Sequence, residues 1–435
     1  MMWRFSRSNP RFIGFKLPIW ALCFLVVLMG ALASCGMENE MKTTNDRTAA
    51  DLLGNPSFPA ISYGGYRGLS RSEQPTLDQL KEDMKILHAM GIRFLRTYNV
   101  QLPHAGNVVQ AIHELKEEDN NFEMYVMLGA WIDCAGAWTD APDHSVEDAE
   151  ANAQEIERAV ALAAQFPDIV KVIAVGNEAM VHWAASYFVA PGVIFRWVNH
   201  LQELKGNGTL PADVWITSSD NFASWGGGGA EYHNEDLNAL IKAVDYVSMH
   251  TYPFHDTHYN PVFWSGEALG GGEVGKGNNG AVENAMARAV AYSQNQYAQV
   301  VAYVQSIDED KPVHIGETGW ASISDGFYGP EGSRAADEYK QALFYQGMRD
   351  WTQSAGISCF YFEAFDEPWK SAANPTDSEN HFGLFTVDGE AKYALWPLVK
   401  HGVFNGLTRN GHPIQCSYSG ETELLNRHVL HPAHH

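Results

Sequence analysis

Two glutamates in similar sequence surroundings are the residues best suited to carry out chemistry. Glu317 follows the short apolar run of residues 313–315, and Glu178 follows the apolar run of residues 172–175. Such runs predict buried strands, so each carboxyl group should lie at the C-terminal end of a strand. Two carboxyl groups on facing walls of one cavity can cleave a glycosidic bond, and a retaining reaction needs them about 5 to 5.5 Å apart.

Strands and helices are predicted to alternate along the whole chain. The predicted strands are residues 59–66, 92–98, 122–131, 169–177, 214–218, 243–251, 312–316 and 357–365. The predicted helices are residues 75–90, 104–118, 147–166, 191–205, 294–307, 334–354 and 394–404. Eight strands in this order predict an α/β protein with a closed parallel (β/α)8 barrel, the TIM barrel, as a single domain whose site is formed by the loops after the strands.

Two connections that follow predicted strands are long. Residues 220–235 include Trp225 and four consecutive glycines, and residues 253–280 include four aromatic residues and a glycine-rich stretch. Long loops in a compact domain are usually functional or disordered. Because both follow strands, we predict that they form walls of the cleft, with floppy insertions as the alternative.

The first 34 residues have the composition of a secretion signal. They contain four basic and no acidic residues, followed by an apolar run at residues 17–32 that is too short for a lasting membrane span. Residues 32–35, Leu-Ala-Ser-Cys, resemble the bacterial lipobox, which implies a lipidated Cys35. We predict a lipoprotein signal peptide at 1–34, a lipidated cysteine and polar tether at 35–55, the catalytic barrel at 56–405 and a C-terminal tail at 406–435. An ordinary signal peptide is the alternative.

The chain is strongly acidic, with 52 acidic and 29 basic residues and a formal net charge of −23. This charge argues against nucleic acid and anionic membrane surfaces as partners. Cys134, Cys359 and Cys416 have no metal-ligand spacing, so we expect no metal and no organic cofactor. We expect a monomer in the bacterial cell envelope, and Gly36 after Cys35 favours the outer membrane.

Several motifs lie at the ends of the predicted strands. They are RTY at residues 96–98, AVGNE at 174–178, HTYPF at 250–254, GETGWAS at 316–322 and FDEPWK at 365–370. Together they resemble glycoside hydrolase family 17, the β-1,3-glucanases and related glucan transglycosylases, over residues 61–398. The segment HFGLFTVDGEAKY at residues 381–393 is more similar to the bacterial and fungal branches than to the plant members. Those branches include exo-acting and glucosyl-transferring enzymes, so endo action cannot be assumed.

The resemblance implies roles for individual residues. Glu178 matches the acid/base and Glu317 the nucleophile, while Asn177 can bond the sugar 2-hydroxyl. The resemblance also implies a bond between Glu367 and Lys370 after the predicted eighth strand. The residues predicted to bind substrate or to support the site are Asn177, Tyr63, Tyr98, Tyr252, Trp320, Glu363, Glu367 and Lys370.

Several of these residues have a structural alternative. Tyr63 and Tyr252 could be ordinary core residues, and Trp320 and Trp131 could be either sugar platforms or core. A buried acid inside a strand, as predicted for Glu363, requires a partner or a sugar hydroxyl. His250 is better explained as a satisfied barrel histidine than as a proton carrier.

Three functions are compatible with the sequence. The first is hydrolysis of β-1,3-glucan such as laminarin by a two-glutamate double displacement, the second is transglycosylation at the same site, and the third is non-catalytic glucan binding. Barrel enzymes for β-1,4-glucan or mannan also place Asn-Glu and Glu on these strands, so the linkage depends on the family motifs. An ionised Glu317 should raise the pKa of Glu178, which predicts a bell-shaped pH profile on the acidic side of neutral.

Overall fold

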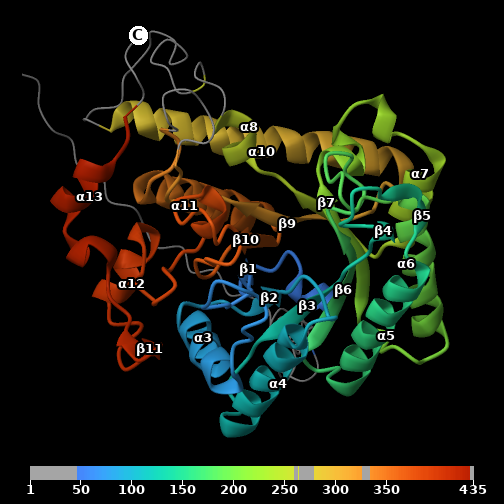
Figure 1. Ribbon diagram of the computed structural model, residues 1–435, viewed down its shortest axis with the longest axis horizontal. Coiled ribbons are helices and arrows are strands. Elements are labelled where there is room, and N and C mark those ends of the chain that lie inside the picture. The colour runs from blue at the N-terminus through green and yellow to red at the C-terminus, as the bar shows by residue number, and fades with distance from the viewer. Residues whose placement is uncertain (1–46, 259–262, 264–278, 326–333, 432–435) are drawn as a thin grey trace, which may run out of the picture. The chain divides into compact units, whose positions relative to one another are not determined.

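Eight parallel strands close into a barrel. The computed structural model describes residues 47–258, 263, 279–325 and 334–431 (Figure 1). The strands follow one another around the barrel in the order β1, β10, β9, β8, β7, β6, β3 and β2. They are β1 (Ala60–Ser62), β2 (Phe94–Arg96), β3 (Tyr125–Ala130), β6 (Val170–Asn177), β7 (Trp215–Asn221), β8 (Val247–His250), β9 (Val313–Gly319) and β10 (Cys359–Phe362). The predicted TIM barrel is therefore confirmed, and each predicted strand overlaps one of these.

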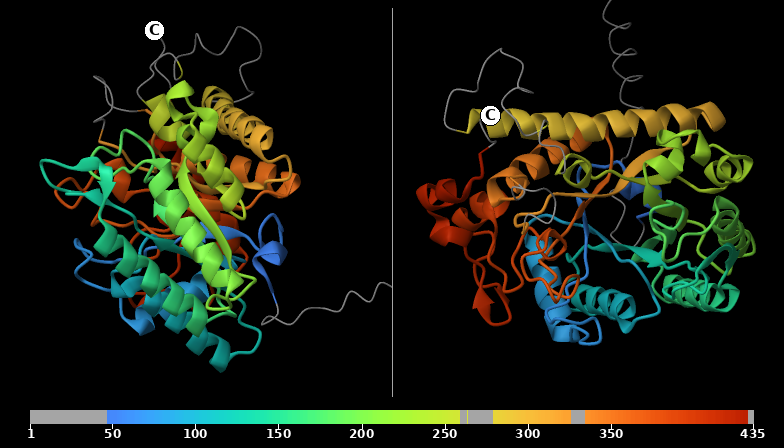
Figure 2. Two further views of the ribbon diagram at one scale, coloured as in Figure 1. Left: turned by 90° about the vertical axis from the view of Figure 1, so that its right-hand side faces the viewer. Right: turned by 45° about the horizontal axis from the view of Figure 1, so that its top comes forward.

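Helices cover the outside of the barrel, as Figures 1 and 2 show. They are α3 (Leu77–Ala89), α4 (Pro103–Glu118), α5 (Ala149–Gln165), α6 (Pro191–Gly206), α7 (Glu235–Ala243), α10 (Gly280–Ile307), α11 (Glu338–Ala355) and α12 (Trp396–Lys400). Helix α3 illustrates why they form. Thr76 and Gln79 make a reciprocal capping box at its start, and Leu80, Met84 and Leu87 line its buried face.

Large side chains at the N-terminal ends of the strands fill the end of the barrel opposite the site. Phe94, Tyr125, Tyr246 and Phe360 belong to one buried cluster, and Phe94 packs edge-on against Phe360 with ring centroids 5.1 Å apart. This packing leaves the polar side chains farther along the same strands at the C-terminal end. The site is therefore built on strands that a packed interior holds rigidly.

The same buried cluster extends to a short helix before the barrel. Helix α2 (Ala49–Leu52) begins with a capping box between Thr48 and Asp51, and both Ala49 and Leu52 are fully buried. Residues inside the segment predicted as a polar tether up to residue 55 are therefore packed against the barrel. The described residues from 47 to 431 belong to one compact unit. The predicted signal peptide and Cys35 lie outside the described residues.

Helix α10 is longer than the sequence predicted. It begins at Gly280 and not at residue 294, and its first half buries Val282, Met286 and Ala289. Its spacing of small apolar residues is helical, yet the sequence analysis assigned residues 281–293 to no element. Among the helices of the described residues, none is long and apolar enough to cross a membrane.

The first long connection, residues 220–235, is compact. It contains two short helical turns, η2 (Ala223–Gly227) and η3 (Ala230–Tyr232). Trp225 is fully buried there, and its indole nitrogen donates to the Ser248 carbonyl at 3.0 Å. The part of the second connection that is described begins with α8 (Pro253–His258), and most of residues 259–278 lies outside the described residues.

Part of the C-terminal segment, strand β11 (Thr408–Arg409), packs beside helix α3 in Figure 1. The segment contains a two-stranded hairpin of β11 and β12 (His412–Pro413), and the helix α13 (Thr422–His428). The Arg409 side chain is fully buried, and its Nε donates to Asp83 Oδ1 at 2.8 Å. The predicted boundary at residue 405 therefore does not mark the end of tertiary packing. A single buried arginine in a polar segment gives no periodic signal by which this contact could be predicted.

Candidate active site

The two glutamates lie at the C-terminal ends of strands β6 and β9. Glu317 lies within β9, because this strand continues to Gly319 and does not end at residue 316 as predicted. Glu178 directly follows β6 and adopts a left-handed backbone with a φ of 47°. Its amide donates to the Ser219 carbonyl at 3.0 Å, which ties the turn to β7. Both side chains line one cavity of about 570 Å³.

Glu317 receives hydrogen bonds from three side chains. Arg96 Nη1 and the Tyr98 hydroxyl donate to Oε2 at 2.5 and 2.9 Å, and the Tyr252 hydroxyl donates to Oε1 at 2.6 Å. Burial alone would raise the pKa of this carboxyl group, since Glu317 is only 7% exposed. The Arg96 charge and the hydroxyl donors outweigh burial, so the pKa lies below its usual value. Glu317 is therefore ionised at neutral pH.

Glu178, in contrast, is protonated at neutral pH. Burial, and then the negative charge of Glu317, raise its pKa to about 8, and the Arg96 charge only partly opposes them. Its Oε1 lies 3.0 Å from His250 Nδ1. At neutral pH Glu178 consequently keeps its proton while Glu317 is charged. One acid and one base in the same cavity are the pair that glycosidic cleavage requires.

His250 connects Glu178 to a buried hydroxyl network. Its Nε2 lies 2.8 Å from Ser219 Oγ, which in turn lies 2.9 Å from Ser248 Oγ. Burial lowers the pKa of His250 to about 4, so the ring is neutral at neutral pH. The histidine is satisfied within the barrel, as the sequence suggested, and it also contacts Glu178, which the sequence did not suggest.

Arg96 belongs to the motif RTY, but the sequence analysis assigned it no role of its own. Besides Glu317, it donates from Nη1 to the Gly316 carbonyl at 2.7 Å and from Nη2 to Asn177 Oδ1 at 2.5 Å. With its oxygen held by Arg96, Asn177 has its amide NH2 group to offer to a substrate. A lone arginine ending an apolar strand was the available signal, because a buried guanidinium needs an acidic partner.

Glu363, Glu367 and Lys370 lie together after β10. Lys370 Nζ donates to Glu363 Oε1 at 2.7 Å and lies 3.5 Å from Glu367 Oε2. The nearer partner of the lysine is thus Glu363, whereas the sequence analysis paired it with Glu367. Glu363 is 1% exposed, and burial raises its pKa well above the usual value even though the Lys370 charge opposes this. Glu367 also accepts a bond from the Tyr66 amide at 3.2 Å.

Two residues predicted for the site, Trp320 and Tyr63, are fully buried, although Tyr63 is among the residues that line a cavity of about 440 Å³. Trp320 is fully buried between Phe254 and Phe344, and its indole nitrogen donates to the Ala335 carbonyl at 2.8 Å. Trp320 is therefore a core residue and not a sugar platform. Tyr63 is also fully buried, and its hydroxyl donates to Asp83 Oδ2 at 2.9 Å.

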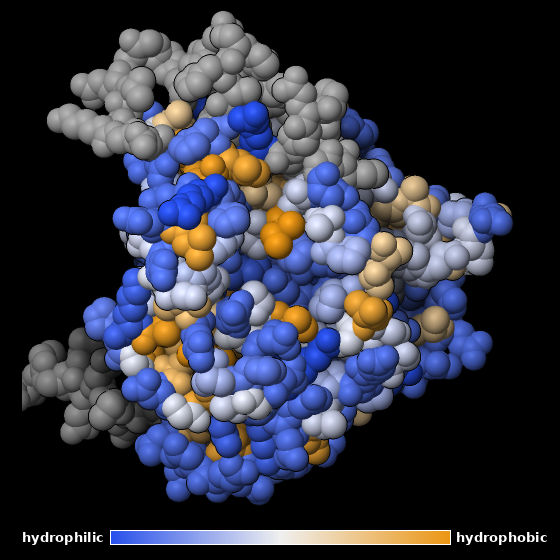
Figure 3. Space-filling model, turned by 60° about the vertical axis from the view of Figure 1, so that its left-hand side comes forward, coloured by the Kyte–Doolittle hydropathy of each residue, from blue (hydrophilic) through white to orange (hydrophobic). Residues whose placement is uncertain are grey.

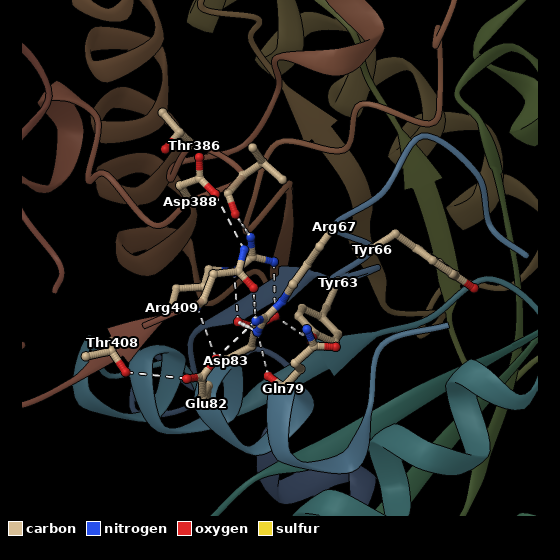
Figure 4. Close-up of polar contacts among 12 residues, drawn as sticks. Tyr63, Tyr66, Arg67, Gln79, Glu82, Asp83, Thr386, Asp388, Thr408 and Arg409 are labelled. Carbon is tan, nitrogen blue, oxygen red and sulfur yellow. Dashed lines mark hydrogen bonds and ion pairs between the residues drawn. The ribbon is translucent and has the colours of Figure 1, made fainter. Parts of the chain in front are cut away.

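Figure 4 shows that Asp83 is the centre of a buried polar cluster beneath the loop that follows β1. Arg67 Nη2 and Arg409 Nε approach Asp83 Oδ1 at 2.9 and 2.8 Å, and Tyr63 bonds the other oxygen. Breaking one side of such a buried pair typically costs about 3 to 5 kcal/mol. The cluster therefore fixes the loop that carries Tyr66 to the rim of the site.

A second cavity adjoins the first. It has a volume of about 440 Å³ and shares Glu317 and Phe362 with the cavity that contains Glu178. Trp131, Trp138, Trp369 and Asn177 line it, together with Tyr98, Glu367 and Lys370. Trp131, for which the sequence left two roles open, therefore faces the cavity. Among the described residues, no cluster of histidine, cysteine and acidic side chains could hold a metal ion.

A parallel barrel with an ionised and a protonated glutamate at its C-terminal end defines a glycosidase-type enzyme. The chain belongs to the BtgE/BtgC glycoside hydrolase domain family, whose model matches residues 60–383. It is similar to the crystal structure of an endo-laminarinase from Formosa Hel1_33_131, with 62% identity, a TM-score of 0.85, and coverage of 89% of this chain and 98% of that chain.

More distant relatives are fungal. A glucan 1,3-beta-glucosidase of Arthroderma benhamiae is 25% identical, and the match covers 77% of this chain and 91% of that protein. A probable glucan endo-1,3-beta-glucosidase of Aspergillus flavus is also 25% identical, over 79% of this chain but only 44% of its own length. A glycoside hydrolase family 17 β-1,3-glucanosyltransferase from Rhizomucor miehei, at 20% identity and a TM-score of 0.54, shares the fold.

Proposed function

We propose that this protein hydrolyses internal β-1,3-glucosidic bonds of laminarin-like glucans with retention of anomeric configuration. The observation that carries the proposal is the pair of glutamates in opposite protonation states that line one cavity. The 62% identity to a protein described as an endo-laminarinase supports the substrate class. Cavities on both sides of Glu317 support endo action, because an internal bond needs room for sugars in both directions.

The first chemical step forms a covalent intermediate. A Glu317 oxygen attacks C1 of the sugar as the bond from C1 to the leaving oxygen breaks, and Glu178 transfers its proton to that oxygen. Oε2 already accepts from Arg96 and Tyr98, whereas Oε1 accepts from Tyr252 alone. Each carboxylate oxygen has two lone pairs, so we assign the attack to Oε1.

The second step releases the sugar. A water molecule attacks C1 from the side of the departed sugar, its proton passes to the Glu178 carboxylate, and the bond from C1 to Glu317 breaks. Both glutamates then have their starting charges. The neutral His250 at 3.0 Å keeps the Glu178 side chain in place in both states.

The test is a screen of soluble polysaccharides by reducing-sugar release, combined with NMR of the first anomer formed. We expect release from laminarin, early oligosaccharides of mixed length and an initial β anomer. Release from β-1,4-mannan without release from laminarin would overturn the substrate class. Glucan binding without turnover would favour the non-catalytic alternative.

We also propose that the protein is held in the cell envelope by lipid on Cys35. The sequence pattern of residues 17–35 supports this location. That segment lies outside the described residues. Expression in a Gram-negative host, followed by detergent phase partitioning, tests it with Cys35→Ser as the matched control. The native chain should enter the detergent phase and the variant should not. Equal partitioning of the two into the aqueous phase would contradict the anchor.

A further inference from the structure

Different residues line the two cavities, and this difference determines the orientation in which the glucan chain binds. Glu317 lines both cavities, but Asn177 lines only the cavity of about 440 Å³ and Glu178 lines only the cavity of about 570 Å³. The amide of Asn177 is placed to bond the 2-hydroxyl of the sugar under attack. Glu178 must face the oxygen of the sugar that leaves. The leaving sugar therefore lies in the cavity that contains Glu178.

The cavity with Glu178 has one large exposed aromatic side chain, Trp183. Among the described residues, Trp138 and Trp183 are the exposed tryptophans, at 61% and 62%, and they line different cavities. Isolated exposed hydrophobic residues are common, and the surface in Figure 3 is mostly hydrophilic with scattered hydrophobic side chains. A tryptophan that opens into a cavity beside a catalytic acid is a different case, because its ring can stack on the apolar face of a sugar.

The turn that carries Trp183 is rigidly held. Its neighbours Val181 and Ala184 are 0% and 5% exposed, and the Ala184 amide donates to the Val181 carbonyl at 3.0 Å. Before the turn, the Met180 amide donates to Asp220 Oδ2 at 2.7 Å. These contacts hold the backbone at the base of the indole, which is itself 62% exposed. Binding then has to order only the side-chain torsions of Trp183, which limits the conformational entropy that is lost.

We propose that Trp183 is a stacking platform for the sugar on the leaving side of the bond, and that it decides how often an acceptor sugar replaces water. This inference rests on the proposed function. In hydrolysis the platform holds the first sugar to depart. In transfer it holds a second β-1,3-glucan chain, whose hydroxyl oxygen attacks C1 while its proton passes to Glu178 and the bond to Glu317 breaks. The products of transfer contain no added water.

The experiment compares two substrates in the full-length protein and in Trp183→Ala. Laminarihexaose places sugars on both sides of the bond, whereas laminaritriosyl β-fluoride has only fluoride on the leaving side. Loss of a stacking contact should lower kcat/KM for laminarihexaose about tenfold. The loss on the fluoride should be much smaller, and the yield of transfer products with added laminaribiose should fall about tenfold relative to hydrolysis. Trp183→Phe should retain most of both activities.

Matched variants separate this inference from the proposed function. Trp138→Ala removes an equally exposed indole from the other cavity and should impair the fluoride and the hexaose alike. Leu430→Ala, which removes an exposed apolar side chain elsewhere (41% exposed), controls for surface effects. Equal losses on both substrates in Trp183→Ala, or an unchanged transfer yield, would overturn the inference while the function stands. Absence of laminarin cleavage by the native protein would overturn the function itself.

Discussion

Glu178 and Glu317 have similar sequence surroundings but opposite protonation states at neutral pH. Each comes at the end of an apolar run, and each carboxyl group is largely removed from water. Glu317 has three hydrogen-bond donors, including one permanent cation, while the side-chain contact of Glu178 described above is to a neutral histidine. Burial raises the pKa of both, and only Glu317 has partners strong enough to reverse it. Neighbouring side chains therefore decide which glutamate is protonated and which is ionised, as the proposed roles of acid and nucleophile require.

The largest expected effect comes from removing the nucleophile. Glu317→Gln leaves the shape of the side chain but cannot form the ester, so kcat on laminarin should fall by roughly 10⁴-fold or more. The measurement is reducing-sugar release by the purified variant, with thermal unfolding to show that the fold survives. Activity within tenfold of the native protein would exclude Glu317 as the nucleophile.

Removal of the acid should have a smaller and chemically distinct effect. Glu178→Ala should lower kcat on laminarin by about 10² to 10⁴-fold. Added azide should then attack the glycosyl-enzyme from the side opposite Glu317 and yield the β-glycosyl azide from an activated substrate such as laminaritriosyl β-fluoride.

The same azide experiment on Glu317→Ala should give the opposite anomer. Azide would take the place of the missing carboxylate and displace the leaving group directly, which yields the α-glycosyl azide. NMR of the two products distinguishes the roles of the glutamates independently of the size of the rate loss. If both variants gave the same anomer, the assignment of acid and nucleophile would be wrong.

Arg96→Met tests whether the Arg96 charge causes the difference in pKa between Glu317 and Glu178. The Arg96 charge is the largest of the causes that lower the pKa of Glu317 against burial, so without it this pKa should rise. Because Glu317 must be ionised to attack, the ascending limb of the pH profile of kcat/KM should move to higher pH, and activity at its optimum should fall by about 100-fold. In the native protein the descending limb should lie near pH 8, where Glu178 loses its proton. An ascending limb that does not move would show that Arg96 does not set the charge of Glu317.

The smallest expected effect comes from the two tyrosines that donate to Glu317. Tyr252→Phe removes the hydroxyl donor to Oε1, whereas Tyr98→Phe leaves Arg96 on Oε2. Tyr252→Phe should therefore lower kcat about tenfold and Tyr98→Phe less, since a hydrogen bond to a charged group contributes about 1.5 to 3 kcal/mol. Equal kinetic effects of the two variants would contradict the assignment of Oε1 as the attacking oxygen.

The alternation of strands and helices could be predicted from the sequence, because it depends on the local spacing of apolar residues. Residues 172–177 and 313–317 have the short apolar pattern of barrel strands wherever they are placed. The hairpin of β4 (Cys134–Ala135) and β5 (Asp143–Glu147) was not predicted, because β4 has only two residues and β5 is largely polar. Trp320 follows a strand like a site residue, yet it is fully buried, because its direction depends on the packing of Phe254 and Phe344.

The sequence by itself determined the barrel, the positions of Glu178 and Glu317 at its strand ends, and the family motifs around them. Only the tertiary structure decided that Arg96 contacts Glu317, that His250 contacts Glu178, and that Trp183 opens into the cavity on the leaving side. The physical reason is distance along the chain. Strand patterns arise among neighbouring residues, whereas the charge of a buried carboxyl group depends on side chains that only closure of the barrel brings within hydrogen-bonding distance.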